Sequence, residues 1–153
     1  MTQEEFKYKR EIMFRKNKGK QEIDIYRRKI SSLFTVDINS IQLLSLEDSD
    51  IIRRTTFKRK SQAVDQKISD SYWLSILQDI KLLPEEYYVF IDNDWEYCGC
   101  FKAFMGRLNE TFKFGQEVTD DLVLISSSLD RKIALDYYEM NGNFYIEYDR
   151  YEN

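Results

Sequence analysis

The sequence contains no histidine and is poor in proline, glycine and cysteine, with 1, 5 and 2 of these among its 153 residues. Without histidine, Ser-His-Asp and Cys-His catalysis, zincin sites and the commonest general base near neutral pH are excluded. The scarcity of proline and glycine excludes collagen-like, linker-like and low-complexity chains. The usual nucleotide-binding loops, G-x-G-x-x-G and G-x-x-x-x-G-K-[ST], are also missing.

The two cysteines are Cys98 and Cys100, separated by one glycine. They are too close for an ordinary disulfide framework, which indicates a reducing compartment. No further Cys or His cluster supplies zinc ligands, so we expect neither a metal nor another cofactor. On a strand both thiols point to one face, where they are either small buried side chains or groups with a redox or nucleophilic role.

Long hydrophobic runs are missing as well. No segment approaches the ~18 apolar residues that a membrane helix needs. The first 15 residues are charged almost from the start, without the apolar core of a signal peptide. We therefore expect a cytoplasmic protein that has no contact with a membrane.

Aromatic and charged residues are abundant. The 11 Tyr, 10 Phe and 2 Trp residues indicate a folded chain, and 153 residues suit one domain with its own core. The net charge of -4 is divided unevenly. Residues 1–70 hold 16 Lys and Arg against 11 Asp and Glu, a balance of +5, whereas residues 71–153 hold 7 against 16, a balance of -9. This asymmetry suggests charged partners.

The first half of the chain predicts helices. Thr2 and Glu5 form a capping box before a helix over residues 3–15, the turn-forming Asn17-Lys18-Gly19-Lys20 interrupts it, and a second helix covers residues 21–34. Asp37 or Asn39 caps a short helix around residues 41–44. Asp50 caps another in the ambiguous segment 47–68, which we expect to contain a mobile loop. The clearest helix begins at Ser69 or Asp70 and ends before Pro84.

After Pro84 the pattern changes to strands. We expect them over residues 87–91, 97–104, 122–125, 132–139 and 143–150, with residues 105–114 ambiguous. Asn141-Gly142 between the last two is the strongest short-range hairpin signal. The sequence thus predicts one α+β domain, 1–153, with a helical part over about 2–83 packed on one face of an antiparallel meander sheet over about 86–150.

The hairpin provides the main candidate site. A two-residue turn places Asp136 opposite Glu147 and Tyr138 opposite Tyr145, with Asp149 beyond them on the same outer face. Like charges directly opposite destabilise a hairpin, and we expect no Lys or Arg between them. Such a face suits a protein partner with a basic surface, although a plain acidic, soluble sheet face has the same composition.

Other charged segments offer alternatives. Asp92, Asp94 and Trp95 form a turn that is the next candidate for binding a partner, although solvated turn acids look the same. The acidic pairs Asp92/Asp94 and Asp120/Asp121 also permit glycosidase-like or metal-dependent chemistry, the third-ranked alternative. In the N-terminal half, basic runs favour either solvated helix faces or a nucleic-acid-binding or regulatory module. These runs are Arg27-Arg28-Lys29, Arg53-Arg54 and Lys58-Arg59-Lys60.

The texture of the second half resembles a known class of proteins. The stretches YYVFIDNDWEYCGCFKAF and DDLVLISSSLDRKIALDYYEMNGNFYIEYDRYEN are similar to the sheet half of small bacterial immunity proteins, which neutralise LXG-type or contact-dependent toxins. The whole chain also resembles YxiF-type proteins of Bacillus. The resemblance implies a cytoplasmic inhibitor that plugs the active site of a nuclease or another toxin, and it assigns no individual residue. Together with the acidic face, it leads us to expect an immunity-type binding protein and no enzyme.

Overall fold

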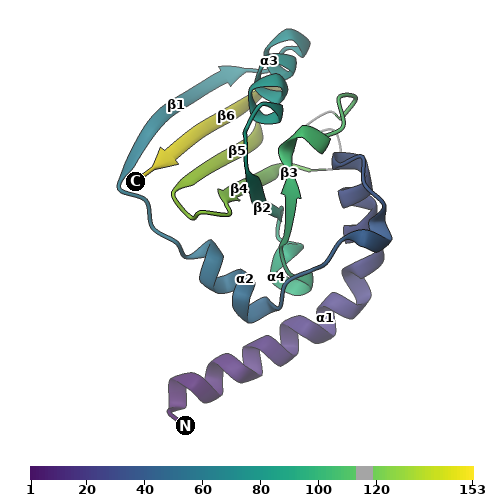
Figure 1. Cartoon of the computed structure of the whole chain (residues 1–153), viewed down its shortest axis with the longest axis vertical. Helices are drawn as coiled ribbons and strands as arrows, with labels where there is room; N and C mark the ends of the chain where they lie inside the picture. Colours follow the sequence, from purple (N-terminus) through teal and green to yellow (C-terminus); the bar gives the residue numbers. More distant parts are fainter. Residues whose placement is uncertain (113–118) are drawn as a thin grey trace.

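A computed structural model of the chain describes residues 1–112 and 119–153 (Figure 1). A six-stranded antiparallel sheet has the strand order β1-β6-β5-β4-β2-β3. Its strands are β1 (Arg59–Lys67), β2 (Glu86–Ile91), β3 (Phe101–Phe104), β4 (Asp121–Ser126), β5 (Arg131–Met140) and β6 (Asn143–Glu152). The helices are α1 (Gln3–Leu33), α2 (Leu46–Arg53), α3 (Asp70–Lys81) and α4 (Trp95–Cys98), with 3-10 turns η1 (Ile38–Ser40) and η2 (Met105–Arg107). The predicted α+β class is confirmed.

The hairpin of β5 and β6 forms as the sequence predicts. Asn141 and Gly142 both adopt positive φ angles, 53° and 79°, as a two-residue hairpin turn requires. Tyr138 pairs with Tyr145 and Asp136 pairs with Glu147 in the expected register. On the core face Leu135, Ile146 and Tyr148 are buried, whereas Phe144, which alternation places on the same face, is 43% exposed near the turn.

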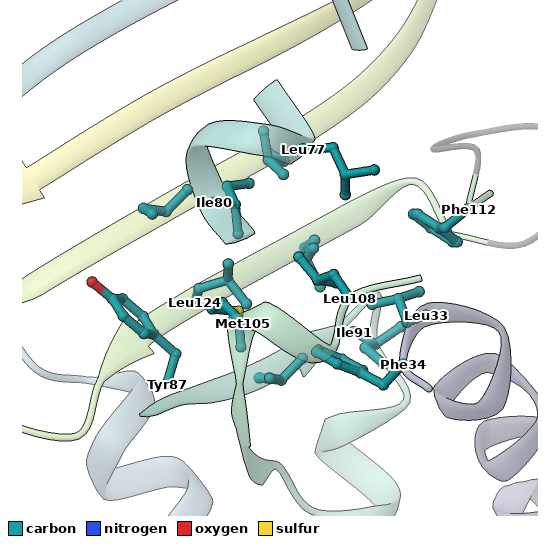
Figure 2. Close-up of a cluster of buried hydrophobic side chains, with 14 of the residues drawn as sticks. Leu33, Phe34, Leu77, Ile80, Tyr87, Ile91, Met105, Leu108, Phe112 and Leu124 are labelled. Atoms are coloured by element: carbon teal, nitrogen blue, oxygen red, sulfur yellow. The ribbon is translucent and has the colours of Figure 1, made fainter. Parts of the chain in front are cut away.

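The main core lies between this face of the sheet and two helices (Figure 2). The predicted helix before Pro84 is α3, and it buries an apolar stripe of Trp73, Ile76, Leu77 and Ile80 at i, i+3, i+4 and i+7. The C-terminal half of α1 contributes a second set of buried apolar residues: Tyr26, Ile30 and Leu33. Burial of these stripes fixes both helices on the sheet.

The first helix is one continuous element of 31 residues, so the predicted interruption at residues 17–20 is wrong. Close packing, not a turn, explains why position 19 is a glycine. A Cβ atom at this position would lie 2.1 Å from the carbonyl oxygen of Tyr97, at the start of the close contact between α1 and α4. Gly19 therefore permits close packing of backbone segments, which a turn signal does not distinguish.

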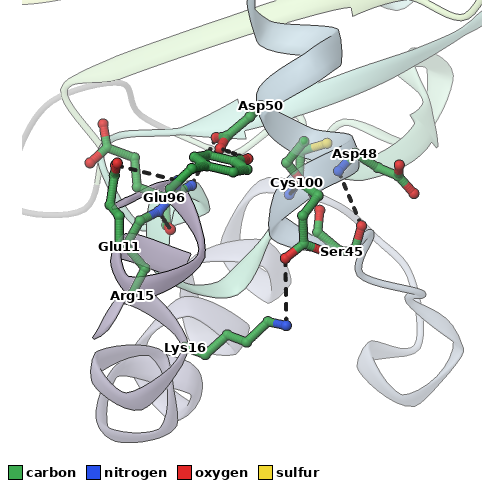
Figure 3. A network of polar contacts seen from close by, with 11 residues as sticks. Glu11, Arg15, Lys16, Ser45, Asp48, Asp50, Glu96 and Cys100 are labelled. Carbon is green, nitrogen blue, oxygen red and sulfur yellow. Dashed lines mark hydrogen bonds and ion pairs between the residues drawn. The ribbon is translucent and has the colours of Figure 1, made fainter. Parts of the chain in front are cut away.

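A polar network joins α1 to α2 and α4 (Figure 3). The guanidinium of Arg15 donates two hydrogen bonds of 2.8 Å to the Asp50 carboxylate, and its Nε donates to the Glu96 carbonyl at 2.6 Å. The hydroxyl of Tyr8 donates to Asp50 at 2.6 Å. Burial raises the pKa of Asp50, but the bonds from Arg15 and Tyr8 outweigh it and leave the pKa below its usual value. The network fixes the N-terminal half of α1, which extends beyond the sheet (Figure 1).

The ambiguous segment 47–68 contains an ordered helix and an edge strand. Ser45, not Asp50, caps α2 by accepting from the Asp48 amide at 3.1 Å. The next element, β1, extends the sheet beyond β6, so the helical part of the chain also supplies a strand and the expected loop is absent from 59–67. In β1 only Val64 is half-buried, and the strand therefore lacks a hydrophobic alternation that would reveal it.

Three further predictions need correction. The predicted helix around residues 41–44 is extended, and Asp37 caps η1 instead. The predicted strand 97–104 begins as α4, and β3 starts at Phe101. Consequently Cys98 packs against the main core and Cys100 belongs to a second cluster on the opposite face. The ambiguous segment 105–114 opens with η2, and its last two residues lie outside the described residues.

That second cluster lies on the outer face of the sheet, opposite α1 and α3. Phe90, Val123 and Ile125 are buried there beneath Ile52 of α2 and the following Phe57. The cover reaches β2, β4 and Ala134 of β5, whereas Asp136 of β5 and all of β1 except Val64 are exposed. No helix within 1–112 or 119–153 is long and apolar enough to cross a membrane.

Candidate functional site

Four carboxylates form a line across the open outer face, which we call the acidic row. Asp65 of β1 pairs with Glu147 of β6, Glu147 pairs with Asp136 of β5, and Asp136 pairs with Asp121 of β4. Neighbouring strands are ~4.8 Å apart, so the acidic row spans roughly 14 Å. Each carboxylate has an acidic neighbour directly across the strand, an arrangement that destabilises a sheet.

Three carboxylates of the acidic row have pKa values raised above those of ordinary Asp and Glu side chains. Partial burial raises the pKa of Asp121, and the neighbouring Asp136 raises it further. Partial burial and Asp120 raise the pKa of Asp136. For Glu147, burial comes first and the carboxylates of Asp149, Asp65 and Asp136 add to it. The face therefore accumulates negative charge that its own side chains do not fully neutralise.

Two tyrosines border the acidic row on the side of the hairpin turn. The rings of Tyr138 and Tyr145 stack at 5.4 Å between centroids, with 16° between their planes. The Tyr138 hydroxyl donates to both carboxylate oxygens of Asp65, at 2.6 and 2.7 Å. This bond raises the pKa of Tyr138 to about 12. A rigid aromatic pair beside a line of acids is the composition of a protein-binding surface.

Beyond the acidic row the same face becomes mixed in charge. The expectation of no Lys or Arg between Asp136, Glu147 and Asp149 fails at Asp149, because Lys60 of β1 lies beside it. Asp149 is only 7% exposed, and its carboxylate lies 3.5 Å from the amino group of Lys60. Lys60 and Lys132 both lie over the ring of Tyr151, at 5.3 and 4.7 Å from its centroid. Asp149 thus belongs to this boundary and contributes less to the open acidic surface than its four neighbours.

The turn proposed as a second surface has a structural role. The amino group of Lys29 on α1 lies 2.8 Å from Asp92 and 3.2 Å from Asp94, and all three side chains are mostly buried. Trp95 packs edge-on against Phe90, with 5.1 Å between ring centroids. These acids are neither solvated nor available to a partner, because they fasten α1 to the end of β2.

The basic runs of the N-terminal half are partly used inside the molecule. Lys29 is held by Asp92 and Asp94, Arg59 forms an ion pair with Glu152, and Lys60 faces Asp149. Arg53 lies over the ring of Phe90. These runs are therefore divided among four separate internal contacts, which weakens the case for a phosphate-binding stripe.

The sequence does not predict that two members of the acidic row, Asp65 and Asp121, lie on this face. Asp65 falls in the segment that resembles a loop, and Asp121 looks like half of a solvated turn pair. Their places depend on which strands pair, because β1 joins β6 across about 80 residues of sequence. The signal available in the sequence was the charge of β1, since edge strands commonly carry charged residues against aggregation.

Features that would favour catalysis are weak among the described residues. Burial raises the pKa of both Cys98 and Cys100 to about 11, which keeps the thiols protonated near neutral pH. No group of three or more Asp, Glu or Cys side chains in the described part of the chain is arranged to hold a metal ion.

Comparison with protein-family models, curated proteins and solved structures found no match to this chain.

Proposed function

We propose that this protein is a non-enzymatic binding domain that holds a basic surface of a protein partner against its acidic row. The observation that carries the proposal is the alignment of Asp65, Glu147, Asp136 and Asp121 on four adjacent strands. Repulsion along this line lowers stability, and the hydrogen bond from Tyr138 to Asp65 and the nearby charges of Arg53, Lys60 and Lys132 offset it only in part. Local features that oppose stability are characteristic of functional sites.

The chemistry of the surface indicates how a partner binds. Exposed carboxylates steer a basic partner during encounter and pair with its Lys or Arg side chains in the complex. The stacked Tyr138 and Tyr145 supply rigid contact area at little cost in conformational entropy. Steering makes association fast and sensitive to salt, whereas a packed aromatic anchor slows dissociation.

In biological terms, we infer an immunity or antitoxin role in the cytoplasm, in which the partner is a toxin domain. The support is the resemblance of the second half to immunity proteins, together with an acidic, tyrosine-bordered face suited to the basic active site of a nuclease. Such inhibition requires no catalytic residue, which agrees with the absence of histidine and the protonated thiols.

The test begins with affinity capture of the partner from the source cell, followed by measurement of both rate constants. Asp136→Asn should slow association and reduce its salt dependence, and Tyr138→Ala should speed dissociation. Asp79→Asn is the matched control, because it removes the same charge from the exposed side of α3, across the sheet. Normal rates in a folded Asp136→Asn, Tyr138→Ala double variant would place the binding surface elsewhere.

A further inference from the structure

A cavity of about 220 Å³ lies on the core side of the sheet, away from the acidic row. It is bounded by Leu83, just beyond α3, and by side chains from β2, β5 and β6. The register brings the side chains together: Tyr87 of β2 pairs with Ser126 of β4, and the Ser126 hydroxyl accepts from the Arg131 amide at 3.0 Å. Arg150 of β6 lies in the neighbouring row, opposite Ile133.

Tyr87 is one of the residues that line this cavity, and its hydroxyl is unsatisfied. The side chain is completely buried, and its hydroxyl has no hydrogen-bond partner among the described residues. Burial raises the pKa of Tyr87, and Glu85 and Asp130 add to this, whereas Arg131 and Arg150 act in the opposite direction. The hydroxyl is therefore within electrostatic reach of both guanidinium groups. A buried, unpaired hydroxyl destabilises a fold, so its retention calls for a reason.

The positive charges of Arg131 and Arg150 are not neutralised by an ion pair with a described residue. The Nε of Arg150 donates to the hydroxyl of Tyr148 at 2.7 Å. The one carboxylate on the wall, Glu152, is already paired with Arg59. The cavity thus combines unneutralised guanidinium groups with a free hydroxyl donor.

We propose that this cavity is an oxyanion site that takes a phosphate group, either free or on a small phosphomonoester. A phosphate group carries nearly two negative charges and several acceptor oxygens, enough to engage both arginines and the Tyr87 hydroxyl at once. A water molecule occupies about 30 Å³ of liquid, so the cavity has room for a phosphate and a few waters. A single carboxylate group carries one negative charge, so it would neutralise only one of the two arginines.

The first experiment titrates inorganic phosphate into the intact protein by calorimetry, with chloride keeping the ionic strength constant. Phosphate should bind and raise the thermal unfolding midpoint, because it binds only the folded chain. Tyr87→Phe should weaken phosphate binding about tenfold or more, the usual effect of losing a hydrogen bond to a charged group. The free variant should be at least as stable as wild type, since its unsatisfied hydroxyl is gone.

Tyr72→Phe provides the matched control. Tyr72 also has a buried hydroxyl without a described partner, but it lies on α3 and does not line the cavity. Its variant should bind phosphate like wild type, whereas Arg131→Gln, at an exposed position, should bind it at least tenfold more weakly. Equal responses to phosphate and chloride, or equal binding by the two tyrosine variants, would overturn the site. Acetate binding as tightly as phosphate would overturn the assignment to phosphate.

Discussion

Two polar regions of the molecule, the network around Arg15 and the acidic row, arrange charged side chains in opposite ways. In the network a buried guanidinium meets a buried carboxylate at 2.8 Å, and three elements contribute further hydrogen bonds. In the acidic row four carboxylates face one another on the surface, and among the described residues only the Tyr138 side chain donates a hydrogen bond to them. The first arrangement stabilises the fold, and the second lowers stability in a way that a basic partner relieves.

The largest predicted effect comes from breaking the network. Asp50→Ala leaves the Arg15 guanidinium buried without its carboxylate, and we expect a loss of about 3–5 kcal/mol in the free energy of unfolding. Urea denaturation measures this loss. Asp48→Ala is the control, because Asp48 lies exposed on the same helix and should cost no more than about 1 kcal/mol. Similar losses in both variants would mean that the network does not join the helices.

The next effect concerns the backbone contact beside the network. Gly19→Ala places a methyl group 2.1 Å from the Tyr97 carbonyl oxygen, so α1 and α4 must separate. We expect a net loss of about 1–3 kcal/mol even though alanine favours helices. Gly106→Ala, whose added methyl would have its nearest neighbour at 3.9 Å, should change stability little. A stable Gly19→Ala variant would show that this contact tolerates separation.

These examples also explain which parts of the fold were predictable. The α3 stripe and the Asn141-Gly142 hairpin are local patterns, and both were predicted correctly. The sequence predicts a turn at Gly19, because the residue whose close approach requires glycine there, Tyr97, lies far along the chain. The edge strand β1 is exposed on both faces and so carries no periodic signal. Asp136 and Glu147, the two members of the acidic row on the hairpin, were likewise predictable. The positions of Asp65 and Asp121 required knowledge of which strands pair.

Removing one charge from the acidic row should have a smaller effect of opposite sign. Asp136 lies between Glu147 and Asp121, so Asp136→Asn removes two repulsive cross-strand pairs. We expect the free energy of unfolding to rise by about 0.2–1 kcal/mol at pH 7. Asp79→Asn on α3 changes the net charge equally and should leave stability within about 0.5 kcal/mol of wild type. A loss of stability in Asp136→Asn would indicate that the carboxylate has a favourable role in the free protein.

The smallest predicted effect is a difference between pH profiles. Asp121, Asp136 and Glu147 have folded pKa values raised above 3.8 for Asp and 4.5 for Glu. The folded state therefore binds protons more tightly at these groups, and their unfavourable contribution is relieved as the pH falls from 7 toward these values. Asp50 behaves oppositely, because its folded pKa is lowered and its stabilisation is lost only below about 3.8.

Wild type should consequently keep or gain stability between pH 7 and about 4.5 and lose it below 3.8, where Asp50 becomes protonated. In Asp136→Asn, Asp121 and Glu147 lose a charged neighbour, so the gain on mild acidification should shrink by a few tenths of a kcal/mol. Urea midpoints of both proteins, measured at intervals from pH 7 to 4.5, resolve this difference. Parallel profiles over that interval would mean that the carboxylates titrate independently and that the acidic row is four separate surface acids. Converging profiles are expected instead, because the stability advantage of the variant depends on charges that wild type itself loses as these carboxylates take up protons.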